Sequence, residues 1–373
     1  MRVAINALFY EPNRSAGTET YLRGLVPALA QAHPDLDLHV VTTRKGAAAL
    51  RRDGWTDFCS LVQLPADEGQ RLRRLHAEQV RLPALVRRRR WDLVHSLASL
   101  APVVPGTRSV VTLHDVNFFH WRTFSLSTTL AMRLLVARAA RRADALLTAS
   151  AAARDDISRT LGVPADRIAV VPHGAGRPPD AEPLAEAELR GRQRLPAGAR
   201  VVLCVAAMRP HKNQELLVRA LPSLPDDVVL VLCGHPEPYV DDLAALARDI
   251  GVADRLRIAG YVADDELEAL WRAAACAAFP TRGEGFGLPI VEALQRGVPA
   301  ACSDIPVLRE VGGALPRYFD PDDPAAAARA IRAALDEPFD AAGAAAQAAR
   351  FSWEEAARGT VAVYDRAMAC TSP

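Results

Sequence analysis

The segment 276–297, CAAFPTRGEGFGLPIVEALQRG, decides the fold of the second half of this 373-residue chain. A short apolar run ends at Pro280, a glycine-rich loop follows, and then a second apolar run begins that contains Pro289. Proline suits the first turn of a helix, because the N–H group that it lacks would have no partner there. Gly297 suits the position just after a helix end. The segment therefore predicts a buried strand, a loop whose backbone approaches a ligand closely, and a helix N-terminus that faces the same ligand.

Two carboxylates accompany this loop. Glu284 lies within it, and Glu292 follows about one turn into the predicted helix. Because the chain reverses between loop and helix, both carboxylates can reach one pocket, where they and the loop amides suit a polyhydroxylated ligand. A solvent-facing acidic loop is the plainer interpretation, but it leaves Gly283, Gly285 and Gly287 at a strand end unexplained. We therefore expect a binding site here.

Short apolar segments alternate with helical ones along the rest of the chain. The expected strands cover residues 2–9, 38–43, 92–96, 109–114, 145–150 and 168–171, and then 201–207, 228–234, 256–260, 276–280 and 299–303. The expected helices lie near 18–33, 70–90, 125–142, 151–161, 213–221, 239–250, 264–274, 289–296 and 323–337. This alternation is typical of parallel sheets that helices cover on both faces, so the chain is predicted to be an α/β protein.

The alternation breaks at 173–199, a stretch rich in proline, glycine and charge that is typical of a linker. We therefore predict two Rossmann-like domains that face a cleft, residues 1–172 and 200–354. The last segment, 355–373, has helical periodicity and is expected to pack back onto the first domain. In open α/β sheets ligands bind beyond the carboxyl ends of the strands, and the motifs described here fall at such ends.

Composition narrows the class of protein. Half of the residues are hydrophobic and 24% are charged, as in ordinary globular proteins. The N-terminus MRVAINALFY reads as a buried strand instead of a signal peptide, and no apolar run reaches the ~18 residues of a spanning helix, so a cytoplasmic location is expected. The six cysteines have neither metal-site nor redox spacing and are expected to be reduced. No nucleic-acid partner is expected.

Charge is distributed unevenly. Residues 1–172 carry 24 Arg and Lys against 15 Asp and Glu, a net charge of +9, whereas the remainder carries 21 against 29, a net charge of −8. A basic N-terminal half suggests an anionic partner, such as a phosphate, a phosphorylated acceptor or a membrane surface. An arginine-rich surface without a partner explains the same numbers, and both interpretations stay open.

The segment EGFGLPIVE, from Glu284 to Glu292, resembles the E-x7-E motif of the family-4 retaining glycosyltransferases, which have the GT-B fold. The resemblance extends over nearly the whole chain. It implies that Glu284 contacts hydroxyls of a donor sugar and that Glu292 holds ribose hydroxyls. It also implies that loop amides contact the sugar and phosphates, at Gly285, Phe286, Gly287 and Leu288.

The segment VAAMRPHKNQELL, residues 205–217, places Arg209 and Lys212 in a strand-to-helix loop that suits a diphosphate. Lys212 is one of only two lysines in the chain, and Asn213 after it is a plausible N-cap for the next helix. The resembling family usually has a Gly-Arg pair at the strand end and a lysine further on.

The lysine of that pattern is present, but Ala206 and Ala207 stand where the Gly-Arg pair would be. We hypothesise that Arg209 supplies the missing cation, and His211 is another candidate.

In the first domain, Gly17 precedes Thr18, a good N-cap, and Ala16-Gly17 resembles the family's first-loop Gly-Gly. Backbone there would approach the donor phosphate or the acceptor, although a glycine before a helix also occurs without function. His114 follows the strand 109–114, where the resemblance implies contact with the donor sugar near the reacting carbon. A histidine that is hydrogen-bonded for structure alone is the alternative.

Two further residues concern the nucleotide base. Gly234 ends an apolar strand, and GYVADDEL, residues 260–267, resembles the family's loop before the base-binding edge. The resemblance implies that backbone at Tyr261 and Val262 touches the base. The aromatic, polar stretch 118–127 is expected to shape the acceptor pocket.

The basic stretch 71–90 ends in four arginines, Arg87 to Arg90. It could lie on an anionic membrane. Pro83 interrupts it, however, and a clean amphipathic pattern is not obvious, so a solvated helix face is the favoured interpretation.

The resemblance implies transfer of a hexose, with retention of configuration, from a nucleotide-diphosphate sugar to a hydroxyl acceptor such as a glycan, a lipid-linked glycan or a secondary metabolite. No Asp-x-Asp motif stands where a diphosphate would bind, so neither a metal nor another cofactor is expected. Alternatives are an epimerase or phosphorylase of the same fold, or a non-catalytic nucleotide-sugar-binding subunit, which the alanines at 206 and 207 keep open. A Rossmann dehydrogenase is disfavoured, because no G-x-G-x-x-G follows the first strand.

Overall fold

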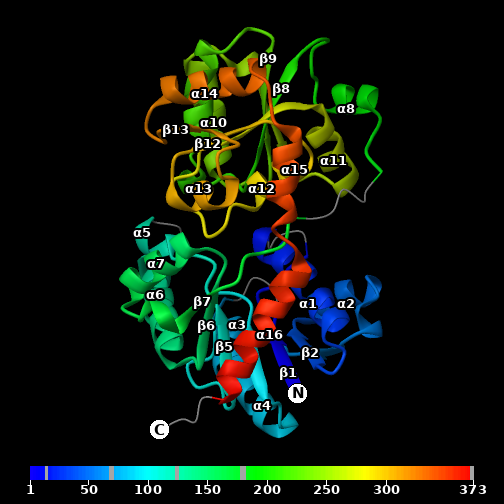
Figure 1. Cartoon of the computed structure of the whole chain (residues 1–373), viewed down its shortest axis with the longest axis vertical. Coiled ribbons are helices and arrows are strands. Elements are labelled where there is room, and N and C mark those ends of the chain that lie inside the picture. Colours follow the sequence, from blue (N-terminus) through cyan, green and yellow to red (C-terminus); the bar gives the residue numbers. More distant parts are fainter. Residues whose placement is uncertain (13–15, 67–70, 122–125, 177–181, 370–373) are drawn as a thin grey trace. The chain divides into compact units, whose positions relative to one another are not determined.

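The computed structural model describes residues 1–12, 16–66, 71–121, 126–176 and 182–369 (Figure 1). The chain divides into two compact units, one made of residues 1–174 and 352–373 and the other of residues 175–351. Each unit contains one parallel sheet with helices between most successive strands, which is the α/β organisation predicted from the alternating segments. Within the described residues, no helix has the length and apolarity needed to cross a lipid bilayer.

The first unit is built on a seven-stranded parallel sheet with the order β3-β2-β1-β4-β5-β6-β7. Its strands are β1 (Arg2–Asn6), β2 (Asp37–Thr42), β3 (Ser60–Gln63), β4 (Leu93–Ser96), β5 (Arg108–Thr112), β6 (Ala145–Thr148) and β7 (Ile168–Val170). The order reverses between β1 and β4, so the carboxyl ends of these two strands flank a topological switch point, the usual ligand position of such sheets.

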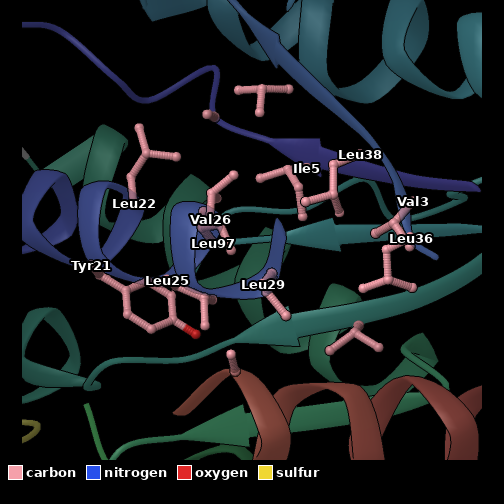
Figure 2. Packing of buried hydrophobic residues seen from close by; sticks show 14 of the residues in the cluster. Val3, Ile5, Tyr21, Leu22, Leu25, Val26, Leu29, Leu36, Leu38 and Leu97 are labelled. Carbon is pink, nitrogen blue, oxygen red and sulfur yellow. The ribbon is translucent and has the colours of Figure 1, made fainter. Parts of the chain in front are cut away.

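The helices of this unit are α1 (Ala16–Ala32), α2 (Arg44–Arg52), α3 (Arg71–His76), α4 (Leu82–Arg89), α5 (Asn117–His120), α6 (Leu126–Arg142), α7 (Ala151–Leu161) and α16 (Trp353–Ala369). A π-helical turn, Ala77–Arg81, joins α3 to α4. One apolar face of α1 packs on β1 and β2, and Figure 2 shows Leu22, Leu25, Val26 and Leu29 directed into this cluster.

The C-terminal helix α16 packs beside α1 in the first unit (Figure 1). Its Tyr364 is fully buried, and its hydroxyl group lies 2.7 Å from Nδ1 of His95, whose Nε2 lies 2.8 Å from Oγ1 of Thr112. Burial lowers the pKa of His95 to about 3, so this ring is neutral. Trp353 at the start of α16 occupies the space where Gly24 and Gly174 lack a side chain.

The second unit is built on a six-stranded parallel sheet with the order β10-β9-β8-β11-β12-β13. Its strands are β8 (Arg200–Val205), β9 (Val228–Cys233), β10 (Leu256–Gly260), β11 (Ala274–Phe279), β12 (Ala300–Ser303) and β13 (Arg317–Phe319). Its helices are α8 (Glu186–Arg192), α9 (Gln214–Ala220), α10 (Tyr239–Asp249), α11 (Asp264–Ala273), α12 (Leu288–Gln295), α13 (Pro306–Gly312), α14 (Pro324–Asp336) and α15 (Ala341–Ala349). Here the order reverses between β8 and β11.

The segment expected to be a linker, 173–199, differs from that expectation where it is described. Its helix α8 packs on α11, with Leu189 buried. Gln193 donates a hydrogen bond to Glu266 at 2.7 Å, and Arg192 pairs with the same carboxylate at 3.3 Å. The polar composition of the segment reflects these contacts with α11, so it belongs with the second unit, and residues 177–181 lie outside the described residues.

Candidate functional site

The switch point of the second sheet brings together the two motifs that the sequence singled out. β8 and β11 are neighbours in the sheet, and the Lys212 loop follows β8 while the glycine-rich loop follows β11. Both loops therefore lie at the same edge of the sheet, where ligands of such sheets bind.

Helix α12 begins and ends as predicted. Gly287 is its N-cap with φ 95°, and Pro289 stands in its first turn. A Cβ on Gly287 would come within 2.7 Å of Leu308, so both backbone angle and space favour glycine there. At the other end Gly297 has φ 66°, its N–H reaches Leu294 O, and Val298 N–H reaches the Ala293 carbonyl, which completes a Schellman motif.

Lys212 and Glu284 form an ion pair between the two loops. Nζ of Lys212 donates to Oε1 of Glu284 over 2.7 Å, and both side chains are about four-fifths buried, with 19% and 18% of their surface exposed. The two loops are also joined through their backbones, since Arg282 N–H donates to the carbonyl of His211 over 2.9 Å. The structure thus places the two predicted ligand-binding side chains within one hydrogen bond of each other.

Arg209 does not join this pair. Its guanidinium group donates to Oε1 of Glu237 from Nη2 at 2.8 Å and from Nε at 3.1 Å, and its side chain is 46% exposed. Because Arg209 precedes Pro210, its backbone is extended, with φ −133° and ψ 150°. Its pairing with Glu237, in the loop after β9, is a contact that the local sequence could not indicate.

His211 is wrong as a candidate cation. Its side chain is buried, and burial, followed by the charges of Lys212 and Arg209, lowers its pKa to about 3. Without a ligand the ring is therefore neutral near pH 7 and supplies no positive charge.

Asn213 stands at the predicted N-cap position of α9, but its side chain does not cap the helix. Its Nδ2 instead donates to the carbonyls of Pro280 and Pro321, over 3.0 and 2.9 Å.

Two further residues of the E-x7-E segment contact residues near the two ends of the second unit, 175–351. Glu292 lies against Gly176, where a Cβ would come within 1.9 Å of its carboxylate oxygen, so only glycine fits beside it. Phe286 is buried and contacts Phe351 edge to face, with ring centroids 5.3 Å apart. Gly285 is buried, whereas Leu288 is partly exposed at the start of α12.

At the same carboxyl edge of this sheet, Gly234 follows β9 with φ 146°. A Cβ there would lie 2.1 Å from the carbonyl oxygen of Ala206, so the backbones of neighbouring strand ends approach each other too closely for a side chain. Val262 and Tyr261 follow β10, and the Tyr261 side chain is 49% exposed. Close packing of the backbone therefore accounts for Gly234 without a ligand.

In the first unit, His114 follows β5 and meets His173, which follows β7. Nε2 of His114 lies 2.8 Å from the carbonyl of Leu97, which only accepts, so this nitrogen carries a proton. Burial lowers the pKa of His114, and its neutral Nδ1 accepts from Nε2 of His173 over 3.3 Å. The rings of Tyr21 and Trp353 pack against His173. His173 is thus a direct partner of His114.

Gly17 lies in the first turn of α1 and is exposed. Helix α1 already includes Thr18, so the predicted N-cap role of this threonine is wrong. Residues 13–15 of the predicted first loop, and 122–125 of the predicted acceptor stretch, lie outside the described residues.

Glu78 was not singled out by the sequence. It lies in the π-helical turn, is buried, and accepts a hydrogen bond of 2.8 Å from Asn6, which also donates to Ser96 over 3.1 Å. Asn6 and Ser96 end β1 and β4, so this polar cluster lies at the switch point of the first sheet. A π-helical turn is invisible in residue periodicity, which explains why the sequence gave no signal.

Comparison with known proteins shows to which family this chain is similar. The sequence model described as "Glycosyl transferases group 1" matches residues 185–352, and the one described as "Glycosyltransferase Family 4" matches residues 15–175. D-inositol 3-phosphate glycosyltransferase from Xylanimonas cellulosilytica is 34% identical over 297 residues, which cover 74% of this chain and 67% of the relative.

A GDP-mannose-dependent alpha-(1-6)-phosphatidylinositol monomannoside mannosyltransferase from Mycobacterium tuberculosis is 32% identical over 314 residues, which cover 77% of each chain. The solved structure of HepE from Anabaena in complex with UDP-glucose has the same fold, with a TM-score of 0.77 at 19% identity, and covers 97% of this chain and 99% of that chain.

Two parallel α/β units, the second with a lysine loop and an acidic glycine-rich loop at its switch point, define a glycosyltransferase of the GT-B fold. The chain belongs to the group 1 glycosyltransferases of family 4. It is a transferase that moves glycosyl groups, and the alternative of a non-catalytic subunit is set aside.

Proposed function

We propose that the chain transfers a hexose from a nucleoside-diphosphate sugar to a hydroxyl acceptor, with retention of configuration and without a metal ion. The observation that carries the proposal is the 2.7 Å contact between Lys212 Nζ and Glu284 Oε1. An ammonium group suits a phosphate oxygen, and a carboxylate suits sugar hydroxyls. Lys212 and Glu284, which share one hydrogen bond, therefore match the phosphate and the sugar of a hexose–phosphate linkage.

The chemical difficulty is the negative charge that appears on the diphosphate as the bond to the sugar breaks. Lys212 and the N-terminus of α12 would stabilise that charge by electrostatics. Arg209 would contribute a second cation after exchanging Glu237 for phosphate. In this proposal the acceptor hydroxyl attacks carbon 1 of the sugar on the face from which the leaving group departs, and the departing phosphate takes the hydroxyl's proton. Double displacement would need a carboxylate nucleophile at the reacting carbon, and the proposal assigns Glu284 to the sugar hydroxyls instead.

The nucleoside would occupy the same sheet edge. Glu292 would hold the ribose hydroxyls, and backbone at Tyr261 and Val262 would meet the base. Two similar proteins are described with GDP-mannose and UDP-glucose, which supports a hexose donor of this type without choosing the base.

We assign acceptor binding to the first unit, and we propose that His114 contacts the donor sugar near the reacting carbon and that Gly17 approaches the donor phosphate or the acceptor. The net charge of +9 on residues 1–172 supports an acceptor that carries phosphate. The names of two relatives, with inositol 3-phosphate and a phosphatidylinositol mannoside, agree with that chemistry.

We also propose a cytoplasmic location with contact to anionic lipid through charge alone. The apolar side chains of α4 are buried against the unit's core, which leaves the arginines 87–90 exposed. Sedimentation with vesicles should show binding to phosphatidylglycerol vesicles that disappears at high salt. Equal binding to phosphatidylcholine vesicles, or none to either, would reject this contact.

A thermal-shift screen of UDP-, GDP-, ADP- and dTDP-hexoses tests donor binding. A ligand at ~100 times its Kd should stabilise the protein by about 2.7 kcal/mol. In Glu284→Gln the free nucleoside diphosphate should bind as in wild type while the intact donor binds more weakly. In Glu292→Gln both should weaken. Absence of binding by all four donor types would reject the proposal.

A further inference from the structure

Asn213 combines two uncommon features. Its side chain is buried, with 4% exposed, and its backbone is left-handed, with φ 60° and ψ 31°. Asparagine tolerates this backbone better than most residues, but a buried residue other than glycine there still needs a reason. The other two non-glycine residues with positive φ in the described part of the chain, Arg90 and Arg194, are exposed and lie outside the loops of the second sheet's switch point.

The amide of Asn213 ties three loops together. One hydrogen bond reaches the carbonyl of Pro280, directly after β11, and another reaches the carbonyl of Pro321, in the turn after β13. The backbone of Asn213 itself ends the short helix Pro210–Lys212, because its N–H donates to the carbonyl of Pro210 over 3.1 Å. Asn213 therefore fixes the loop of Lys212 with respect to the loop of Glu284.

Only an asparagine meets both demands of this position. Aspartate tolerates the left-handed backbone but offers carboxylate oxygens to two carbonyl oxygens, which repel them. Glycine adopts the backbone freely but has no amide. Alanine lacks the amide and is strained at this φ.

We propose that Asn213 is a positioning residue that holds Lys212 against Glu284 in the geometry that glycosyl transfer uses. The inference rests on the proposed function of that pair. When the backbone of a lysine moves, its flexible side chain no longer holds the ammonium group in place. A misplacement of about 1 Å at a reacting centre is sufficient to reduce turnover up to ~100-fold.

The chain offers a direct readout of the lysine, because Lys45 and Lys212 are its only two lysines. Reductive methylation with 13C-formaldehyde keeps the positive charge and gives one NMR signal for each dimethyl-lysine and one for the N-terminal amine. Lys45→Arg and Lys212→Arg assign the two lysine signals. We expect Asn213→Gly and Asn213→Asp to shift the Lys212 signal toward the position of an exposed lysine and to leave Lys45 unchanged. Arg194→Gly, at another left-handed position, is the matched control and should shift neither signal.

Activity with UDP-glucose and GDP-mannose provides the second readout. Asn213→Gly should lower kcat/KM at least tenfold, and adding it to Lys212→Ala should lower kcat/KM no further, because both changes remove the same interaction. A role in stability alone would give an unmoved Lys212 signal and additive losses, and either result would overturn the inference. Absence of transfer by the wild-type protein would count against the proposed function, whereas the NMR comparison would still decide whether Asn213 positions Lys212.

Discussion

Lys212 is one of two lysines in a chain that otherwise uses arginine for positive charge. It contacts a carboxylate of the glycine-rich loop, and its side chain is largely buried. A compact ammonium group fits a site that must accept a carboxylate or phosphate oxygen in a small space, where a planar guanidinium group is larger. We therefore expect Lys212 to provide most of the electrostatic stabilisation of the leaving diphosphate.

Lys212→Ala should therefore reduce kcat by two to three orders of magnitude, the range typical of losing one group that stabilises developing charge. Steady-state release of nucleoside diphosphate measures it. Lys45→Ala, at the only other lysine, is the control and should retain wild-type turnover, since Lys45 lies exposed on α2 of the first unit. Near-normal turnover by Lys212→Ala would remove this lysine from the mechanism.

Glu78 gives a prediction about pH. Burial raises its pKa from 4.5 to about 7, against the opposing effects of Asn6 and Arg74. Between these two values the folded state holds a proton that the unfolded state has lost, so the free energy of unfolding falls as pH rises from about 5 to 8.

Glu78→Gln cannot titrate, so relative to wild type it should gain stability over that range, on the order of 3 kcal/mol at most. Denaturant unfolding at pH 5 and pH 8 measures the difference. Asp35→Asn, at an exposed carboxylate, should run parallel to wild type. If Glu78→Gln also runs parallel, the carboxyl of Glu78 does not titrate in this range.

Residue types and spacing predicted the positions of Lys212 and Glu284 at strand ends, but not the partners of their neighbours. Arg209 pairs with Glu237, a contact between loops after different strands that no local pattern encodes. The N-cap position of Asn213 was predicted, but the partners of its side chain were not, because the carbonyls of Pro280 and Pro321 come from loops far away in the sequence.

Among elements, the sequence missed two of the four edge strands. β3 and β13 lie at the ends of their sheets, and they have four and three residues. Edge strands are often short and carry polar residues. β3 and β13 therefore lack the apolar runs that revealed the other strands, including the edge strands β7 and β10. The central strands were visible because both of their faces are covered.

The packing of α16 on α1 can be tested with a glycine-to-alanine substitution whose expected effect on stability is opposite to the usual one. Alanine in place of glycine inside a helix normally stabilises by roughly 0.5–1 kcal/mol. In Gly24→Ala, however, the added Cβ would lie 2.1 Å from the ring of Trp353, which is itself packed on Gly174. We expect a destabilisation of about 1–3 kcal/mol instead.

Gly191→Ala, in α8, is the matched control, since nothing lies within 4 Å of its added Cβ. It should show the normal stabilisation when both variants are unfolded in denaturant. If Gly24→Ala were stabilised as well, Trp353 would not be held in the position described.

At the scale of the molecule, the chain closes its first unit with its last helix. Residues 352–373 belong with residues 1–174, and buried side chains of α16 complete the core around α1, including Ala357, Val363 and Tyr364. The second unit has a core of its own.

A chain that stops at Phe351 should therefore retain a folded second unit and lose the fold of the first. Hydrogen exchange followed by mass spectrometry should show rapid exchange in β1, β2 and α1, with protection kept in β8 to β12. Protection of both units in the shortened chain would contradict the role given to α16.

The division into two parallel α/β units could be predicted from the alternation of strands and helices, and its boundaries only in part. The stretch 173–199 has a linker's composition, yet its helix α8 packs on α11. Composition shows that charged residues and prolines are abundant, but it does not show that Arg192 and Gln193 form hydrogen bonds with Glu266.

We propose that the enzyme transfers a hexose from a nucleoside diphosphate with retention of configuration and without a metal ion. The most direct measurement follows UDP-glucose and GDP-mannose, labelled with 13C at carbon 1, by NMR with D-inositol 3-phosphate and an excess of EDTA. If transfer is retaining and metal-independent, the product should have the α configuration of the donor and should form at the same rate with and without EDTA. A β-configured product, or transfer that starts only after a divalent cation is added, would contradict the proposal.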